Sequence, residues 1–379
     1  MQSGSHNTAM LHHQKHTYAL VEVTHPLGIK VDLDSGVDMR VKDHDTFDGE
    51  LKHGFTAHPK VDKSTGELLV SAWSIKSPTF TYSLIDANRK LVTSFKVPIA
   101  SQRMIHDFCV SKNYIIVPDL PLELNGKNAI QNMRTVFDFN KKAKARYGLL
   151  KRRAKDASEI QWFDLAPEDV HFCFHFANAY EICENGHDIV VMHCCAWKDF
   201  EFFEPEDEHP LQKLEDWYLQ FREFRFNLST GEYLMENLIA DVNCEFPCIN
   251  PDYAANRAHQ FVYVATMSAE EYRELSPKAK ENIQWSGFIK YDVKTKRIVN
   301  QVSYGGEKMA GEVIFHPRKN AKSEDDGYLM TFVYDPHGEK SEYCLWDAKD
   351  CELVMKFDTN QRVPFGFHGI FVDEEDLEK

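Results

Sequence analysis

The sequence predicts an all-β protein built from many short strands, and three observations support this fold class. Short apolar, β-branched or aromatic runs recur along the chain, separated by turn sequences, as in "KSTGELLVSAW" and "DANRKLVTSFKV". Aromatic residues make up 12% of the 379 residues, with 26 Phe and 15 Tyr, which favours β structure around a large apolar interior. Many short strands joined by tight turns are typical of a barrel, a sandwich or a propeller.

Helical patterns are few, and the sequence predicts helices only near 205–222 and 268–283. Near the end of the chain, the run "VPFGFHGIFV" at 363–372 predicts a buried strand, because apolar and aromatic residues dominate it. This run carries His368 between two glycines, which is an unusual position for a histidine. The question that follows is what a histidine does inside a buried strand.

Composition and charge exclude several classes of function. The net charge of −15 argues against binding to nucleic acid. No run of about 18 apolar residues is present, and the first residues lack the pattern of a signal peptide. The nine cysteines show no CxxC spacing, so they are interpreted as reduced thiols of an intracellular protein. We expect a cytoplasmic location, with a plastid as the alternative if a transit peptide precedes the chain.

One segment is strongly basic, because 141–155 ("KKAKARYGLLKRRAK") holds eight Lys or Arg residues. Such a segment could make a peripheral contact with an anionic membrane surface. The alternative is a solvated loop beside an acidic surface, and we favour this second interpretation.

Four histidines lie within or at the edge of strand-like apolar runs: His58, His106, His175 and His368. A single histidine in such a run is more often a core residue than a metal ligand. Four of them favour a shared metal, because each buried imidazole needs partners for two nitrogens. Neutral imidazoles suit iron, copper, zinc or nickel, and a four-nitrogen set with open positions suits a redox metal that binds oxygen. His171 lies four residues before His175, and strand alternation places both on one face, so the sequence does not separate them.

Metal-bound histidines usually donate their second N–H to a carboxylate or a carbonyl. Glu22, Glu245 and Glu312 lie in similarly apolar runs and are the candidate partners, with edge-strand surface positions as the alternative. Together with the histidines they make seven polar residues at intervals of 36 to 70 residues, about one four-stranded blade each. Seven inward-pointing polar residues favour a seven-bladed propeller with a metal on its axis.

With these residues identified, the chain resembles the carotenoid cleavage dioxygenase (carotenoid oxygenase) family over nearly all of its length. The most specific pieces are "AHPKVD", "MIHDF", "FCFHFANAYE", "EDDGYLMTFVYD" and "RVPFGFHG", in the order of the family. The resemblance implies an all-β, seven-bladed β-propeller capped by a few helices and loops, formed as a single domain by residues 1–379. Family members begin well before the motif that "NT" at 7–8 resembles, so the resemblance also implies an N-terminal truncation.

The resemblance implies a role for each of these residues. His58, His106, His175 and His368 would hold Fe(II), with the pairs Glu22–His106, Glu245–His175 and Glu312–His368 around it. Thr8 would crowd the open position of the iron. The residues beside the ligands would line a tunnel for the substrate, with core packing as the alternative, and they are Phe174, Phe246 and Phe367.

The implied activity is cleavage of one double bond of a carotenoid or apocarotenoid by O2, which gives two carbonyl products. The partners would be an apolar polyene and O2. Relatives that cleave stilbenes carry a lysine just before the first glutamate, and this chain has Val21 there, which argues against a hydroxystilbene substrate. A retinoid isomerohydrolase and an inactive propeller that binds apolar ligands are the remaining alternatives.

Overall fold

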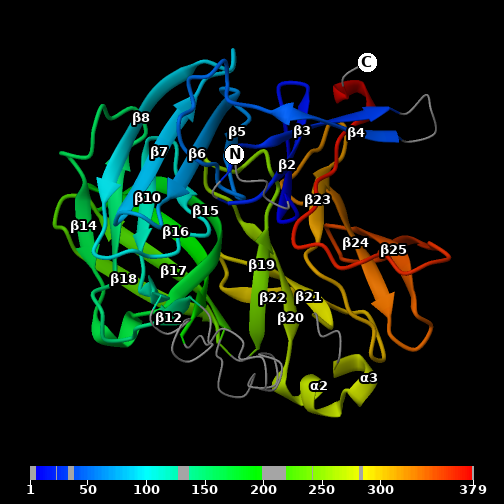
Figure 1. Ribbon diagram of the computed structural model, residues 1–379. Coiled ribbons are helices and arrows are strands. Elements are labelled where there is room, and N and C mark those ends of the chain that lie inside the picture. Colours follow the sequence, from blue (N-terminus) through cyan, green and yellow to red (C-terminus); the bar gives the residue numbers. More distant parts are fainter. Residues whose placement is uncertain are drawn as a thin grey trace.

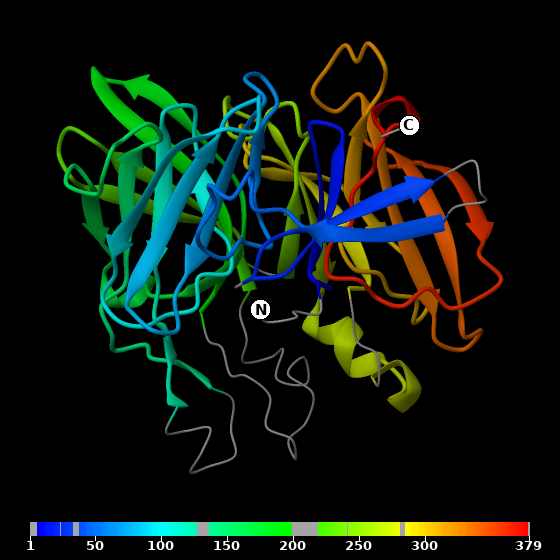
Figure 2. The ribbon, with the colours of Figure 1, turned by 45° about the horizontal axis from the view of Figure 1, so that its top comes forward.

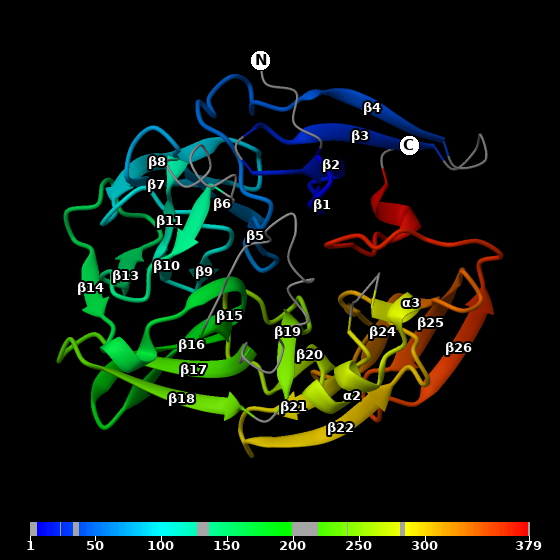
Figure 3. The ribbon, with the colours of Figure 1, turned by 60° about the horizontal axis from the view of Figure 1, so that its bottom comes forward.

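The computed structural model shows a β-propeller in which antiparallel sheets are arranged around a central axis (Figure 1, Figure 3). The structure describes residues 6–22, 24–32, 38–126, 136–198, 219–240, 242–280 and 285–377. These residues form six four-stranded sheets and one two-stranded ribbon. The prediction of an all-β propeller is therefore confirmed.

In the first two sheets, the strands follow one another in chain order. The first sheet comprises β1 (Ala9–His13), β2 (His16–Leu20), β3 (Leu27–Asp32) and β4 (Asp38–His44). The second comprises β5 (Lys60–Asp62), β6 (Glu67–Trp73), β7 (Thr79–Ile85) and β8 (Leu91–Pro98). The third has the order β14-β13-β10-β9, and an inserted ribbon, β11–β12, separates β10 from β13 along the chain. Its strands and those of the ribbon are β9 (Cys109–Val110), β10 (Tyr114–Asp119), β11 (Leu122–Leu124), β12 (Phe137–Phe139), β13 (Arg146–Lys151) and β14 (Gln161–Asp164).

The last three sheets again follow chain order, each as a simple antiparallel meander. The fourth comprises β15 (Phe172–Glu184), β16 (His187–Trp197), β17 (Leu219–Asn227) and β18 (Tyr233–Ile239). The fifth comprises β19 (Asn243–Cys248), β20 (Phe261–Met267), β21 (Gly287–Asp292) and β22 (Arg297–Ser303). The sixth comprises β23 (Ile314–Pro317), β24 (Gly327–Asp335), β25 (Lys340–Asp347) and β26 (Leu353–Asp358).

The prediction of seven blades differs from the structure, which shows six among the described residues. The seven polar residues used for the count do not each lie on a blade. Six of them come from the six sheets or the loops that enter or leave them, but His368 comes from an irregular segment after β26. Figure 3 shows this red C-terminal segment between the sixth sheet and the first. Phe332 in β24 is 44% exposed, so no further described sheet covers that side chain.

The predicted strand at 363–372 is wrong, because these residues pair with no strand in the part of the chain that the structure describes. Their hydrogen bonds go to side chains instead. The N–H of Val363 donates to Ser341 Oγ at 3.0 Å, and the N–H of Gly369 donates to Glu312 Oε1 at 2.7 Å. Pro364 has no N–H to offer a ladder, which explains why an apolar run here does not extend a sheet.

Of the helix predicted at 268–283, the described part forms two short helices, α2 (Ala269–Glu274) and α3 (Pro277–Lys280), and 281–283 lie outside the described residues. Ser268 and Glu271 form a capping box at the start of α2, and Pro277 forces the break because the chain before a proline prefers extended conformations. Figure 2 shows both helices at one end of the propeller, beyond the sheets. Of the helix predicted at 205–222, residues 205–218 lie outside the described residues, and 219–222 belong to strand β17 instead.

At least half of the eight basic residues in the segment 141–155 form ion pairs with acidic neighbours. Arg146, in β13, contacts Asp119 at 2.8 Å and also stacks on an indole ring, and Arg152 is buried between two carboxylates. These ion pairs favour the interpretation of this segment as part of the protein's own surface rather than as a membrane patch. In the described part of the chain, no helix is long and apolar enough to cross a membrane.

Arg152 connects the second sheet to the third and is a test of how the sheets are held together. Its Nη1 lies 2.9 Å from Asp62 Oδ2 and its Nη2 lies 3.1 Å from Glu67 Oε2, with its side chain only 5% exposed. Arg152→Met should lower the free energy of unfolding by about 3–5 kcal/mol, because it leaves the buried Asp62 carboxylate without its cation and leaves Glu67 paired only with the largely exposed Arg153. Denaturant unfolding followed by tryptophan fluorescence measures this. The exposed Lys63–Asp252 pair supplies the control, since Lys63→Met should change stability by less than about 1 kcal/mol.

Candidate metal centre

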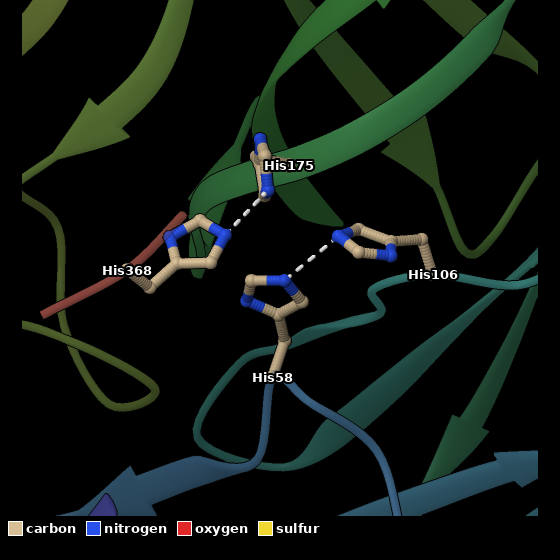
Figure 4. Close-up of side chains that lie close together, drawn as sticks. All are labelled: His58, His106, His175 and His368. Atoms are coloured by element: carbon tan, nitrogen blue, oxygen red, sulfur yellow. Dashed lines mark hydrogen bonds between the residues drawn. The ribbon is translucent and has the colours of Figure 1, made fainter. Parts of the chain in front are cut away.

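Four histidines from four different segments meet on the axis of the propeller (Figure 4). His58 and His106 lie in the loops that enter β5 and β9, His175 lies in β15, and His368 lies in the C-terminal segment. One ring nitrogen of each lies within 4.8 Å of the others. His58 Nε2 is 2.9 Å from His106 Nε2, and His175 Nε2 is 3.1 Å from His368 Nε2. The sequence-predicted set is therefore brought together completely.

Irregularities in two inner strands place side chains at this centre. The ladder between β15 and β16 shifts register between Cys173 and Phe176 and again after Phe176, around His175. The ladder between β19 and β20 shifts between Glu245 and Cys248. Phe246, inside that second bulge, has a left-handed backbone with φ of +51°. Bulges re-aim side chains, and strain of this kind concentrates at functional sites.

The structure separates His175 from His171, which the sequence could not do. His171 precedes β15 and is completely buried away from the centre. Its Nε2 bonds Tyr147 Oη at 2.8 Å, and its Nδ1 donates to the Asp169 carbonyl at 2.7 Å. Both of its nitrogens are therefore satisfied, and His171 is a core histidine. The bulge between the two residues breaks the strict alternation that would have placed them on one face.

Three carboxylates fix the orientation of three of the imidazoles, in the pairs that the resemblance implied. His175 Nδ1 lies 2.6 Å from Glu245 Oε2, and His368 Nδ1 lies 2.8 Å from Glu312 Oε2. His106 Nδ1 bonds Glu22 Oε1 in the same way. An ionised carboxylate only accepts hydrogen bonds, so each of these Nδ1 atoms carries the proton and each neutral ring directs a bare Nε2 at the centre.

This tautomer makes the centre incomplete without a cation. With both Nδ1 protons donated to carboxylates, the Nε2 atoms of His175 and His368 present lone pairs to each other across 3.1 Å. Two such acceptors cannot share a hydrogen bond, and they repel unless a positive charge lies between them. Two nitrogens that each lie about 2.1 Å from one ion at a right angle are about 3.0 Å apart. The donor set and its spacing therefore fit a transition-metal ion.

Protonation also favours metal binding at this centre. Burial lowers the pKa of His58 well below its ordinary value, and the three neighbouring imidazoles lower it further. Burial likewise lowers the pKa of His175, although the Glu245 carboxylate opposes this shift. For Glu245 itself, burial would raise the pKa, but His175 and the hydrogen bonds from Phe246 and Trp197 together outweigh burial and lower it. Neutral imidazoles beside ionised carboxylates are the states that a metal requires.

Aromatic side chains line one side of the centre. The ring of Phe174 lies 5.3 Å from that of His106, and the ring of Phe246 stacks on His175 at 5.1 Å. Trp197 and Trp285 extend this wall, at 5.4 Å from Phe174 and 6.4 Å from Phe246 respectively. Tyr272 in α2, Leu275 directly after it and Ala279 in α3 belong to the same apolar cluster. Two of the three predicted tunnel residues thus lie beside the histidines.

Phe367 and Thr8 lie differently. The side chain of Phe367 is 59% exposed, and it borders a cavity beside β24 and β25 together with His368. Thr8 is half-buried just before β1, and its N–H donates to the carbonyl of Leu20 at 3.1 Å. The next residues, Ala9 and Met10, border a cavity of about 350 Å³ that His58 and His368 also line.

One partner of the centre was not found from the sequence. Trp197 Nε1 donates to Glu245 Oε1 at 3.0 Å, so the carboxylate that orients His175 also orients an aromatic wall residue. The two residues are 48 positions apart, and nothing in their local sequences signals the contact. The β-bulges were missed for a similar reason, since they depend on the register between two strands.

The fold and the site define a β-propeller protein whose axis carries four convergent histidines. The family model described as RPE65, retinal pigment epithelial membrane protein, matches residues 2–373. The chain belongs to this family, which is also that of the carotenoid cleavage dioxygenases among its curated relatives.

Two of these relatives cover nearly the whole chain. "Carotenoid 9,10(9',10')-cleavage dioxygenase 1" of Pisum sativum is 33% identical over 392 residues, which are 99% of this chain and 68% of that protein. The protein of the same name from Arabidopsis thaliana is 33% identical over 100% of this chain and 68% of its own length. "9-cis-epoxycarotenoid dioxygenase NCED6, chloroplastic" of Arabidopsis thaliana is 30% identical over 93% of this chain and 57% of its own length.

Solved structures show the same fold. The cobalt-substituted Synechocystis ACO has a TM-score of 0.79 and 21% identity, and covers 96% of this chain and 73% of its own. The lignostilbene dioxygenase of Pseudomonas brassicacearum has a TM-score of 0.81 and 24% identity, and covers 97% of this chain and 75% of its own.

The assignment of His175 rather than His171 as a ligand has a direct test. His175→Ala should weaken binding of Co(II) or Fe(II) at least roughly 100-fold, because it removes a ligand and not only its partner. Metal analysis after dialysis against a chelator measures this. His171→Ala is the matched control and should retain wild-type metal content. The reverse pattern in these two variants would contradict the assignment.

Glu245→Gln tests the carboxylate pairs. The amide carries no charge to raise the basicity of His175, and it cannot accept the hydrogen bonds of His175, Trp197 and Phe246 at both of its ends. Metal affinity should fall by roughly 10–100-fold, which is the usual loss when a residue that hydrogen-bonds a metal ligand is replaced. Competition with a chromophoric chelator measures the affinity.

The control for Glu245→Gln is Glu223→Gln, because Glu223 is also buried and bonds His193 Nε2 at 3.0 Å away from the centre. This variant should bind metal as the wild type does. If both variants lose affinity equally, the loss reflects damage to the core rather than to the centre.

Proposed function

We propose that this chain is a non-haem Fe(II) dioxygenase that cleaves a C=C bond of a carotenoid or apocarotenoid with O2. The observation that carries the proposal is the pair of opposed Nε2 lone pairs of His175 and His368, each fixed by a carboxylate on the far side of its ring. The relatives named carotenoid cleavage dioxygenases support the reaction class. Residues 1–379 would act as a single propeller domain.

Iron is the metal that best matches the reaction. His58, His106, His175 and His368 would hold it, and it would supply the binding and activation of O2 beside the substrate. Four neutral imidazoles would leave the ion its full positive charge, and such a ligand set would leave room for O2. Thr8 would narrow one of these positions, as the resemblance implies. The cobalt-substituted neighbour shows that a protein of this fold accepts a divalent transition metal.

The protein's own contribution is orientation and exclusion of water. Glu22, Glu245 and Glu312 hold three rings in one tautomer, so none of these three imidazoles has to turn or lose a proton before the metal binds. Their negative charges also offset part of the positive charge that is buried on the axis.

The aromatic wall suits a rigid apolar chain. Phe174, Phe246, Trp197 and Trp285 would pack against the polyene beside the histidines, and the depth of insertion would decide which bond lies at the metal. The reaction needs no reductant, because both oxygen atoms enter the two carbonyl products. A balanced equation follows: one alkene and one O2 give two aldehydes, or an aldehyde and a ketone.

A stilbene is the second candidate substrate, because the lignostilbene dioxygenase shares this fold. Val21 favours the carotenoid instead. It directly precedes Glu22, and its isopropyl group offers no charge to a phenolic oxygen. A plastid location is part of the proposal only if a transit peptide precedes this sequence, in keeping with the relatives named as chloroplastic.

The test is incubation of the Fe(II)-loaded chain with β-carotene, an apocarotenal and resveratrol under ¹⁸O2, with product identification by mass spectrometry. We expect two labelled carbonyl fragments from a carotenoid or apocarotenoid, and none from resveratrol. His175→Ala is the control for metal dependence and should form no product. Faster cleavage of resveratrol would replace the substrate assignment, and full iron without any product would refute the dioxygenase activity.

A further inference from the structure

An ion pair joins two of the four histidine-bearing segments close to the centre, and its aspartate also bonds a third segment. Lys60 Nζ lies 2.6 Å from Asp107 Oδ1, with exposed fractions of 22% for the lysine and 2% for the aspartate. Lys60 is two residues after His58, and Asp107 directly follows His106. This pair therefore fixes the distance between the loop that carries His58 and the loop that carries His106.

Asp107 also reaches the third segment. Its Oδ2 accepts the backbone N–H of Phe176 at 3.0 Å, and its Oδ1 accepts the N–H of Phe108 at 2.7 Å. Phe176 follows His175 and lies in the bulge of β15, where the regular ladder is interrupted. The carboxylate thus satisfies a backbone donor in the bulge and stabilises the bend that turns His175 to the axis.

His58 depends on this arrangement more than the other histidines do. Within the described residues, a glutamate bonds Nδ1 of His106, His175 and His368, but none bonds Nδ1 of His58. His58 is held through its backbone, because its N–H donates to Thr56 Oγ1 at 3.0 Å. Thr56 Oγ1 in turn lies 3.5 Å from the His106 carbonyl. The orientation of the His58 ring is therefore set by its loop, and Lys60 ties that loop to Asp107.

We propose that Lys60 and Asp107 are positioning residues that hold His58, His106 and His175 in register for one metal ion. The inference rests on the metal centre of the proposed function. It adds the contacts that keep three of the four histidines of that centre together. A buried ion pair is a weak source of stability, since apolar side chains of similar size often stabilise a fold equally well. Its fixed geometry, rather than its contribution to stability, is what the centre uses.

The test measures metal binding directly and needs neither substrate nor O2. Apo full-length chain is titrated with Co(II), and affinity and the d–d absorption bands, which report the coordination geometry, are recorded for each variant. Lys60→Met should weaken Co(II) binding by roughly 10–100-fold and change the bands. Lys60→Arg, which keeps the charge and reaches the same carboxylate, should restore most of the affinity and the wild-type bands. Asp107→Asn should resemble Lys60→Met, because the amide loses the charge and one of the two acceptors.

Lys63→Met is the matched control, because it removes a lysine three residues away whose partner, Asp252, lies at the surface. It should bind Co(II) with wild-type affinity and spectrum. Unfolding midpoints of the apo variants show whether a loss of affinity is only a loss of fold. Lys60→Met with unchanged affinity and bands, or a loss that equals that of Lys63→Met, would overturn the inference and leave the proposed function intact. A wild type that binds no Co(II) would refute both.

Discussion

The centre of this protein depends on one electrostatic constraint, the convergence of imidazole lone pairs on a small volume. Each carboxylate behind a ring holds the proton of the neutral imidazole on Nδ1, which leaves Nε2 bare, so Glu245 and Glu312 set up the repulsion between His175 and His368. Such an arrangement is stable only when a cation is bound or when the surrounding structure holds the rings rigidly. The propeller supplies that rigidity, because it holds one ring on strand β15 and the other three on segments that enter or follow different sheets.

The sheets hold the rings through exceptions to regular β structure. Regular strands alternate their side chains, so extending the alternation of β15 back to His171 would place His171 and His175 on one face, whereas His171 lies in the core and His175 lies at the centre. The bulge in β15 resolves this conflict, and a second bulge in β19 places Glu245 behind His175 while Phe246 takes a left-handed backbone. The aspartate that accepts the Phe176 N–H shows how one of these irregularities is stabilised.

Sequence reasoning found the parts of the site that local pattern encodes. Histidines and glutamates in apolar runs are unusual enough to be recognised one by one, and His58, His106, Glu22 and Glu312 were identified in this way. What it could not provide was register and long-range contact. The number of sheets was overestimated, because seven polar residues were equated with seven blades, whereas His368 reaches the axis from an irregular segment. Apolar content predicted a strand at 363–372. This irregular segment differs from a strand in having no pairing partner among the described strands.

Glu245 couples one of the four convergent histidines to the aromatic wall. Its Oε2 bonds His175 Nδ1 and the N–H of Phe246, while its Oε1 accepts the indole N–H of Trp197. The ring of Phe246 stacks on His175 and that of Trp197 packs on Phe174, so one carboxylate fixes His175 and two wall positions at once. A substitution in the wall that displaced Trp197 would release one oxygen of Glu245 and loosen His175. The shape of the apolar slot and the geometry of the metal centre are therefore not independent, and changes that alter which substrate fits should also alter how tightly the metal is held.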